Sequence, residues 1–105
     1  MNADKKYTNE AQQRLLRVVM LLGEDVITGV APAQIAKALS VPPSYVTRDL
    51  DNLKTAGWAV QQEETGRWLL GAKAGALGVK VMASIDRADR KVAEARNRFT
   101  RNNND

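Results

Sequence analysis

Two short helical patterns separated by a tight polar break constrain this chain more than any other feature. They occupy Pro32 to Gly57, which reads PAQIAKALSVPPSYVTRDLDNLKTAG. Their apolar positions recur at helical spacing: Ile35, Ala36 and Leu39 in the first run, and Val46, Leu50 and Leu53 in the second. A proline begins each run, at Pro32 and Pro43, where a missing N–H costs a helix nothing. Gly57 is a natural end for the second run. Two helices so closely joined predict a helix-turn-helix with 43–56 as the recognition helix.

The second helix presents a polar side. If its apolar positions face inward, a step of about 100° per residue places several polar residues outward: Ser44, Arg48, Asp51 and Thr55, flanked by Tyr45, Thr47 and Asn52. In this motif the N-terminal half of the helix enters the major groove of DNA. Arg48 can contact guanine with two hydrogen bonds, and Ser44 and Thr47 can serve bases or phosphates. The Asp51 carboxylate would repel phosphate unless it accepts a hydrogen bond from the amino group of a cytosine. The alternative is a solvated face of an ordinary small helical protein.

Composition excludes most other functions. The 105 residues are 44% hydrophobic and 27% charged, and they include neither cysteine nor histidine. This length suits one domain, and the missing cysteines fit a reducing cytoplasm. The longest apolar run, Val18 to Leu22, is too short to cross a membrane, and we see no signal peptide. No metal-ligand cluster, phosphate loop or nucleophile–base pair can be assembled, so we expect no enzyme, no metal and no cofactor.

The net charge of +4 suits a nucleic-acid partner, but it is too mild to decide the question. Residues 79–105 carry seven basic residues against four acidic ones, so most of the surplus lies outside the recognition unit.

The first predicted helix is apolar around most of its circumference. Thr8 or Asn9 can cap it, Glu10 favours its first turn, and residues 1–8 form a flexible tail. The sequence LLRVVMLL then needs burial on more than one side. Later parts of the same chain could cover it, or a second copy could do so through Leu16 and Met20.

A β-hairpin is predicted after the recognition helix. Two short runs, 58–62 and 67–70, surround a turn that contains Gly66. Such a hairpin is a wing, and Arg67 is its best candidate for a phosphate or minor-groove contact. The acidic tip argues against deep insertion, and we expect Trp58 and Trp68 to pack in the core. Residues 26–30 could supply one more small strand.

The C-terminal quarter predicts a long helix. We expect residues 71–78, with three glycines, to form a hinge or an irregular start, and 101–105 to be a disordered end. Between them a seven-residue apolar repeat runs through Val81, Ile85, Ala88, Val92, Ala95 and Phe99. This stripe favours a homodimer, with Val81, Ile85, Val92 and Phe99 as candidate contacts, although it could instead fold back on its own domain. The fold class is therefore mainly α with a small hairpin: a winged helix-turn-helix at 9–73 and a linker or dimerisation helix at 74–100.

The order and spacing of these features carry a family resemblance. The matching residues are the apolar helix at 15–22, the runs 33–39 and 41–44, Arg48, Leu50, Leu53, Ala56-Gly57-Trp58 and Gly66-Arg67-Trp68-Leu69-Leu70-Gly71. Together they resemble the N-terminal winged-helix domain of the IclR family of bacterial transcription regulators, whose wing typically closes with a Gly-Arg-aromatic-x-Leu-Gly phrase. The resemblance covers roughly residues 10–80.

The resemblance implies sequence-specific binding of double-stranded DNA by a dimer that pairs through its first helix. It places five reading residues on the recognition helix: Pro43, Ser44, Tyr45, Thr47 and Arg48. Family members continue into a ligand-sensing domain, whereas this chain stops after the linker-like helix. We therefore expect no small-molecule effector and a freestanding regulator, bacterial or phage, acting in the cytoplasm.

The leading hypothesis is thus a small homodimeric transcription regulator. Its candidate phosphate contacts are Lys37, Lys54, Arg67 and Lys73, and Asn52 is a further DNA-binding candidate beside the outward face of the recognition helix. One rival is a DNA-binding accessory subunit of a packaging or replication assembly that reads no bases, which the charges of Asp49, Asp51 and the wing tip make credible. Another rival is a winged-helix adaptor that binds only protein.

Overall fold

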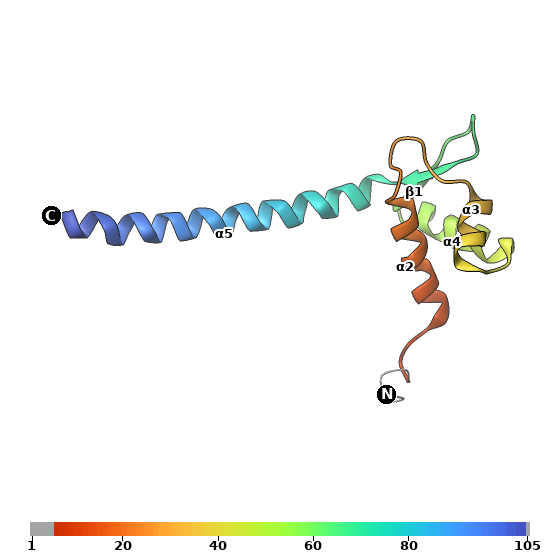
Figure 1. Ribbon diagram of the computed structural model, residues 1–105, viewed down its shortest axis with the longest axis horizontal. Helices are drawn as coiled ribbons and strands as arrows, with labels where there is room; N and C mark the ends of the chain where they lie inside the picture. The colour runs from red at the N-terminus through yellow and green to blue at the C-terminus, as the bar shows by residue number, and fades with distance from the viewer. Residues whose placement is uncertain (1–5, 105) are drawn as a thin grey trace. The chain divides into compact units, whose positions relative to one another are not determined.

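The computed structural model describes residues 6–104, so residues 1–5 of the predicted N-terminal tail and residue 105 lie outside the described residues. The chain divides into two compact units at the junction between Ala74 and Gly75. The first unit contains helices α2 (Glu10–Leu22), α3 (Pro32–Leu39) and α4 (Pro43–Thr55) and strands β1 (Ala59–Gln61) and β2 (Trp68–Leu70) (Figure 1). The second unit consists of all but the first turn of α5 (Ala72–Asn104).

Local sequence signals set the ends of the first helices. The Asn9 side chain accepts a hydrogen bond from the Gln12 N–H at 3.0 Å, which caps α2, and Gly23 ends it. Pro32 occupies the first turn of α3, where the Gln34 side chain accepts a hydrogen bond from the Ala31 N–H. Ser40 ends α3 in the left-handed region, with a φ of 56°.

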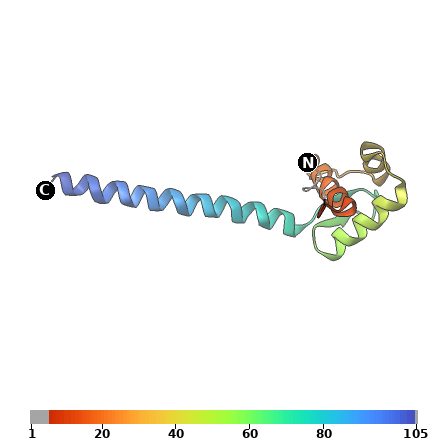
Figure 2. The same cartoon turned by 90° about the horizontal axis from the view of Figure 1, so that it is seen from below.

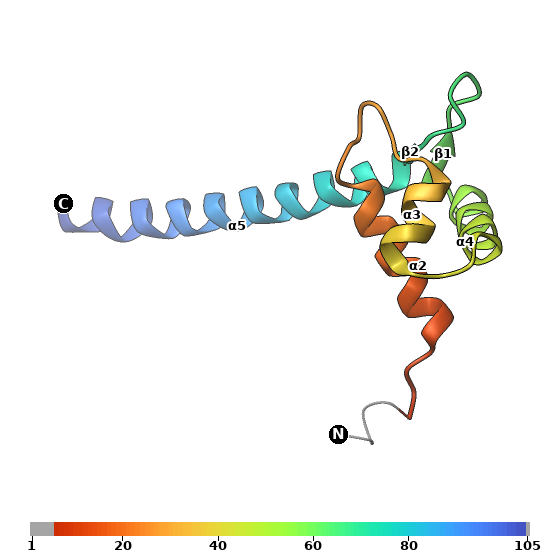
Figure 3. The same cartoon turned by 45° about the vertical axis from the view of Figure 1, so that its right-hand side comes forward.

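Helix α4 begins at the predicted residue and ends at Thr55, one residue before the predicted end at 56. Pro43 stands in the first turn of α4, and Gly57 follows its end with a φ of +83°, which glycine adopts without a steric penalty. Helices α2, α3 and α4 pack against one another, as Figures 2 and 3 show from two further directions. The predicted helix-turn-helix is therefore confirmed.

The hairpin is also confirmed. β1 and β2 pair antiparallel, with Ala59 opposite Leu70 and Gln61 opposite Trp68, and the loop between them extends beyond the helices (Figure 3). The predicted strand at 26–30 is wrong except for Val30, which forms an isolated bridge with Trp68. The rest of that segment is a turn, because the Asp25 carboxylate accepts hydrogen bonds from the N–H groups of Ile27 and Thr28.

One core holds the helices and the hairpin together. Its fully buried members come from α2, α3 and α4: Val18, Leu22, Ile35, Val46 and Leu50. Leu53 and Trp68 are also buried, and Trp58 packs against them half-buried. This confirms both the inward face predicted for the recognition helix and the core role of the two tryptophans.

Helix α5 is longer than predicted at both ends. Residues 72–78 are regular helix rather than a hinge, because alanine and leucine between the glycines favour the helix and each glycine costs only about 1 kcal/mol relative to alanine. Residues 101–104 continue the helix instead of forming a disordered end, since neither proline nor glycine follows Gly78 to stop it. Searching the described helices for a stretch long and apolar enough to span a bilayer finds none.

Candidate nucleic-acid interface

The outward side of α4 is open to solvent along its length. Val46, Leu50 and Leu53 anchor the opposite side in the core. Every side chain predicted to face outward is exposed, as are the flanking candidates: Pro43, Ser44, Tyr45, Thr47, Arg48, Asp51, Asn52 and Thr55. The helix is therefore a rigid rod with a polar face that other parts of its unit leave uncovered.

Some polar side chains of this face form hydrogen bonds with the backbone of α4 itself. The Thr47 hydroxyl donates to the Pro43 carbonyl oxygen at 3.2 Å, and the Asn52 amide donates to the Arg48 carbonyl oxygen at 2.8 Å. Asn52 also lines an apolar hollow of about 250 Å³ between α2 and the end of α4. The structure thus places Asn52 one turn after Arg48, at the edge of the open side of α4 that faces α2.

A cluster that the sequence did not reveal lies beside Arg48. Asp49 is only 5% exposed, and its carboxylate accepts two hydrogen bonds from Arg14 on α2, at 2.6 Å from Nε and 3.0 Å from Nη2. These hydrogen bonds are the main cause that raises the pKa of Arg14. The Tyr45 ring contacts the Arg14 guanidinium at 4.8 Å and that of Arg48 at 5.1 Å, measured from Cζ to the ring centroid.

Helical periodicity contained a signal for this ion pair. Asp49 follows Val46 by three residues and precedes Leu53 by four, so it occupies the buried face of α4. Arg14 likewise precedes the buried Val18 by four residues. Two opposite charges on two inward faces predict a buried pair. The negative charge of Asp49 is thus paired with Arg14 inside the protein, so it no longer supports the hypothesis of an accessory subunit that reads no bases.

The candidate phosphate contacts come from three different elements. Lys37 on α3, Lys54 in the last turn of α4 and Lys73 in the first turn of α5 are all exposed. The Lys73 side chain lies close to Gly57: a Cβ atom added at Gly57 would be 3.2 Å from the Cγ and Cδ atoms of Lys73. Its backbone N–H also donates to the Gly57 carbonyl oxygen, so the start of α5 is fixed to the end of the recognition helix.

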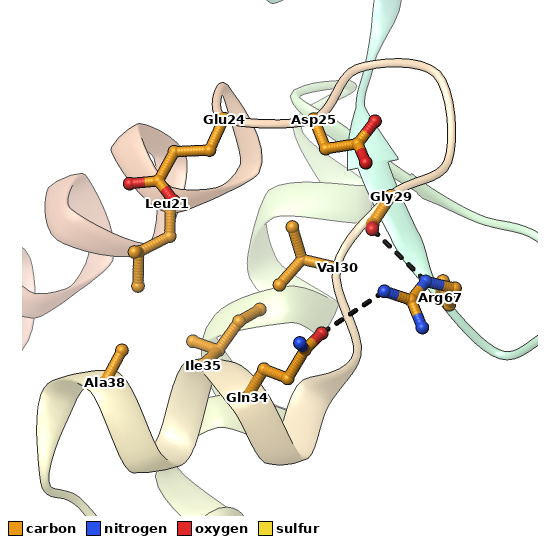
Figure 4. A pocket seen from close by; sticks show the side chains of 9 residues that line it. All are labelled: Leu21, Glu24, Asp25, Gly29, Val30, Gln34, Ile35, Ala38 and Arg67. Carbon is orange, nitrogen blue, oxygen red and sulfur yellow. Dashed lines mark hydrogen bonds between the residues drawn. The ribbon is translucent and has the colours of Figure 1, made fainter.

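Arg67 is half-buried and points inward (Figure 4). Its Nε donates to the Gly29 carbonyl oxygen at 3.2 Å, and its Nη2 donates to Gln34 Oε1 at 3.3 Å. It lines a hollow of about 340 Å³ together with Asp25 and Ile35. These contacts connect the residue just before β2 to the α2–α3 connection and to the first turn of α3, so Arg67 has a bracing role that the sequence did not predict.

The candidate dimerisation residues are exposed in both units. Leu16 and Met20 on α2 are 59% and 74% exposed. On α5, the predicted stripe is also exposed: Val81, Ile85, Val92 and Phe99. Within the part of the chain that the structure describes, no three or more acidic, histidine or cysteine side chains gather as metal ligands would.

The chain is similar in structure to known winged-helix proteins. The crystal structure of Pseudomonas aeruginosa HmgR superposes with a TM-score of 0.66 and 26% identity, over 74% of this chain and 33% of that one. The Zalpha domain of cyprinid herpesvirus 3 ORF112, described in its binding mode to Z-DNA, matches with a TM-score of 0.51 and 24% identity, over 56% of this chain and 93% of that one. No protein-family model and no curated protein sequence matches the chain. The two structural matches show the winged-helix fold, and the chain spans a third of the length of HmgR.

Proposed function

We propose that this protein binds double-stranded DNA sequence-specifically as a small homodimeric transcription regulator. In this proposal α4 enters the major groove and the hairpin β1–β2 is the wing. The observation that carries it is the orientation of α4, whose apolar side is buried at Val46, Leu50 and Leu53 while its polar side is exposed. A rigid helix with this division fits the groove, and its N-terminal half can contact base edges.

The polar side chains of α4 offer the chemistry that base reading needs. Arg48 can donate two hydrogen bonds to guanine, and Ser44 can donate to a base or a phosphate. Thr47 and Tyr45 lie beside them and complete the surface with Pro43. The resemblance to the IclR family and the structural likeness to HmgR support a regulator, and ORF112-Zalpha, which shares the fold, binds Z-DNA.

Backbone contacts would supply most of the affinity. Lys37, Lys54 and Lys73 extend from three elements around the open face. Arg67 can add a contact from the wing through the donors of its guanidinium that Gly29 and Gln34 leave unused. For each phosphate contact, the logarithm of the binding constant falls by about 0.9 when the salt concentration rises tenfold. Four contacts per subunit would therefore make binding strongly salt-dependent.

Dimerisation would match the protein to a two-fold symmetric operator. The exposed apolar residues of α2 and α5 are the surfaces we assign to it, because exposed apolar surface on a helix is stabilised by a partner. A regulator of this kind acts where the DNA is, in the bacterial cytoplasm.

Selection of genomic fragments by the purified protein tests this proposal. The fragments retained at about physiological salt are sequenced, and one of them is footprinted. Enrichment of a common, nearly palindromic sequence and a protected stretch of two half-sites are expected. Retention of random fragments without a protected sequence would favour an accessory subunit that coats DNA, which the exposed Asp51, Glu63 and Glu64 would suit. No retention even at low salt would favour a protein-binding adaptor.

A further inference from the structure

A continuous line of contacts connects the buried side of α4 to Arg48 on its outward side. It begins at Asp49, whose side chain is 7% exposed in its ion pair with Arg14, itself 14% exposed. Both hydrogen bonds of the pair run from one guanidinium to one carboxylate, which fixes the plane of the Arg14 group. The Arg14 group is therefore a fixed part of the interface between α2 and α4.

The Tyr45 ring extends this line to the surface. Its centroid lies 4.8 Å from Arg14 Cζ and 5.1 Å from Arg48 Cζ, distances at which an aromatic ring attracts a cation. Tyr45 and Arg48 are three residues apart on one helix, so their side chains are neighbours. One ring thus contacts a guanidinium that is fixed from within and a guanidinium that is exposed.

The charges explain why two guanidinium groups can share one ring. An unpaired Arg14 would repel Arg48, and it would be available for the phosphates of a DNA backbone. The Asp49 carboxylate neutralises Arg14, so Arg48 remains the cation that faces outward. An arginine that is already ordered loses less side-chain entropy when it contacts a base.

We propose that Asp49, Arg14 and Tyr45 are positioning residues that hold the Arg48 guanidinium in one direction for base reading. This inference depends on the proposed DNA binding and deepens it. In this arrangement Tyr45 acts through Arg48 and not by a contact of its own hydroxyl with DNA. Helix α2, which has no place in the groove, then contributes to sequence discrimination through Arg14.

Four variants separate positioning from direct contact and from general stability. Tyr45→Leu removes the ring and leaves the ion pair, and Tyr45→Phe keeps the ring without the hydroxyl. The double change Arg14→Leu with Asp49→Leu removes the pair and leaves no buried charge unpaired, so the fold is retained. Arg17→Leu is the matched control, because Arg17 lies one turn along α2, is exposed and contacts no aromatic ring in the described part of the chain. Thermal unfolding is measured for each variant, and a cooperative transition identifies the variants that are folded.

The first measurement is the ratio of affinities for the selected sequence and for a scrambled duplex, at several salt concentrations. We expect Tyr45→Leu and the double variant to lower this ratio about three- to tenfold, a loss typical of one or two cation–π contacts. The slope of log affinity against log salt concentration should differ between these variants and the unmodified protein by less than about 0.9, the contribution of one phosphate contact. Tyr45→Phe retains the ratio within about twofold, and Arg17→Leu changes both affinities by the same factor. A loss with Tyr45→Phe as large as that with Tyr45→Leu would show direct contact by the hydroxyl and overturn the inference, as would an unchanged ratio in the double variant.

The second measurement needs no DNA. The ring current of Tyr45 should shift the NMR signals of the Arg48 δ-methylene and Nε–H protons upfield in the unmodified protein and in Tyr45→Phe. The shift should vanish in Tyr45→Leu and shrink in the double variant. If the shifts behave in this way but no DNA sequence is selected, the proposed function fails and the positioning of Arg48 stands. If a sequence is selected and the shifts are absent, the positioning fails alone.

Discussion

Val30 and Trp68 exchange two backbone hydrogen bonds, at 2.8 Å from Val30 N to Trp68 O and 2.9 Å from Trp68 N to Val30 O. The bonds join the connection between α2 and α3 to the second strand of the hairpin. The Trp68 side chain, only 8% exposed, packs on the same core as Leu22 and Leu50. The wing is therefore held to the helices by backbone pairing and by a buried aromatic ring together.

Replacing Trp68 with alanine should destabilise the whole first unit. A buried tryptophan-to-alanine change costs about 3–5 kcal/mol in the free energy of unfolding, because the burial is lost and a cavity is left. Urea unfolding followed by circular dichroism measures the effect. Val60→Ala, on the paired strand but 48% exposed, is the control and should cost less than about 1 kcal/mol. A Trp68→Ala effect as small as the control would mean that the wing is not part of the core.

Asp25 should make stability depend on pH in the acid range. Hydrogen bonds from the Thr28 and Ile27 N–H groups lower the pKa of Asp25 in the folded protein. A carboxyl with a depressed folded pKa stabilises the fold above its unfolded pKa, about 3.9, and loses that contribution as the pH falls through the folded value. The melting temperature of the unmodified protein should therefore exceed that of Asp25→Asn at neutral pH, and the difference should shrink below about pH 4.

The neighbouring carboxylate provides the comparison for Asp25. Glu24 is exposed, and its side chain makes no hydrogen bond within residues 6–104. The melting temperature of Glu24→Gln should therefore change with pH in the acid range in the same way as that of the unmodified protein. A difference between Asp25→Asn and the unmodified protein that stays constant from pH 7 to pH 2.5 would show that the turn does not depend on the charge of Asp25.

Arg67→Lys should separate bracing from DNA contact. Lysine keeps the charge but cannot reproduce the two hydrogen bonds to Gly29 and Gln34. We expect a melting temperature lower by a few degrees, equivalent to about 1 kcal/mol, with an unchanged salt slope of DNA binding. Arg67→Ala should lower the melting temperature equally and also reduce the slope by about 0.9 if Arg67 contacts a phosphate. Equal slopes in both variants would confine Arg67 to bracing.

The helices were predictable because their signals are local. Asn9, Pro32 and Pro43 mark helix starts through their own backbone and side-chain chemistry, and Gly57 marks an end. The inward face of α4 follows from periodicity alone. Within this unit, residues a few positions apart therefore define the recognition helix and its open side.

What the sequence did not predict depends on residues far apart in the chain. The Arg14–Asp49 pair spans 35 positions and the contact from Arg67 to Gln34 spans 33. Periodicity places Arg14 and Asp49 on inward faces, but only the tertiary structure shows that these two faces meet. Arg67 stays a predicted phosphate or minor-groove contact because of its place on the wing. What the sequence did not predict is the tertiary packing that also directs its guanidinium to Gly29 and Gln34. The prediction for the start of α5 was wrong for a local reason: the glycines suggested a break, but the alanines and leucine between them favour a continuous helix.

Charges placed on the apolar stripe of α5 should abolish dimers. Ile85 and Val92 lie seven residues apart, so they occupy equivalent positions of the repeat, and each is about half exposed. The double change Ile85→Glu and Val92→Glu should convert a dimer to a monomer in sedimentation velocity, because two charges would be buried without partners. Ser84→Glu, next to the stripe, is the control that should keep the dimer. If the double variant stays dimeric and Leu16→Glu becomes monomeric, α2 forms the interface.

Arg48→Ala tests base reading most directly. A bidentate arginine–guanine contact is worth about 1–3 kcal/mol of discrimination, so the variant should lose that much at the selected sequence and tolerate any base at one position. Lys54→Ala, in the last turn of the same helix, is the matched loss of a positive charge. It should weaken binding to all duplexes alike and reduce the salt slope by about 0.9. Because the two changes remove equal charge from one helix, only a base contact can make them differ in sequence preference. Equal losses by Arg48→Ala on selected and scrambled duplexes would make Arg48 a phosphate contact, and base reading would then have to come from Ser44 and Thr47.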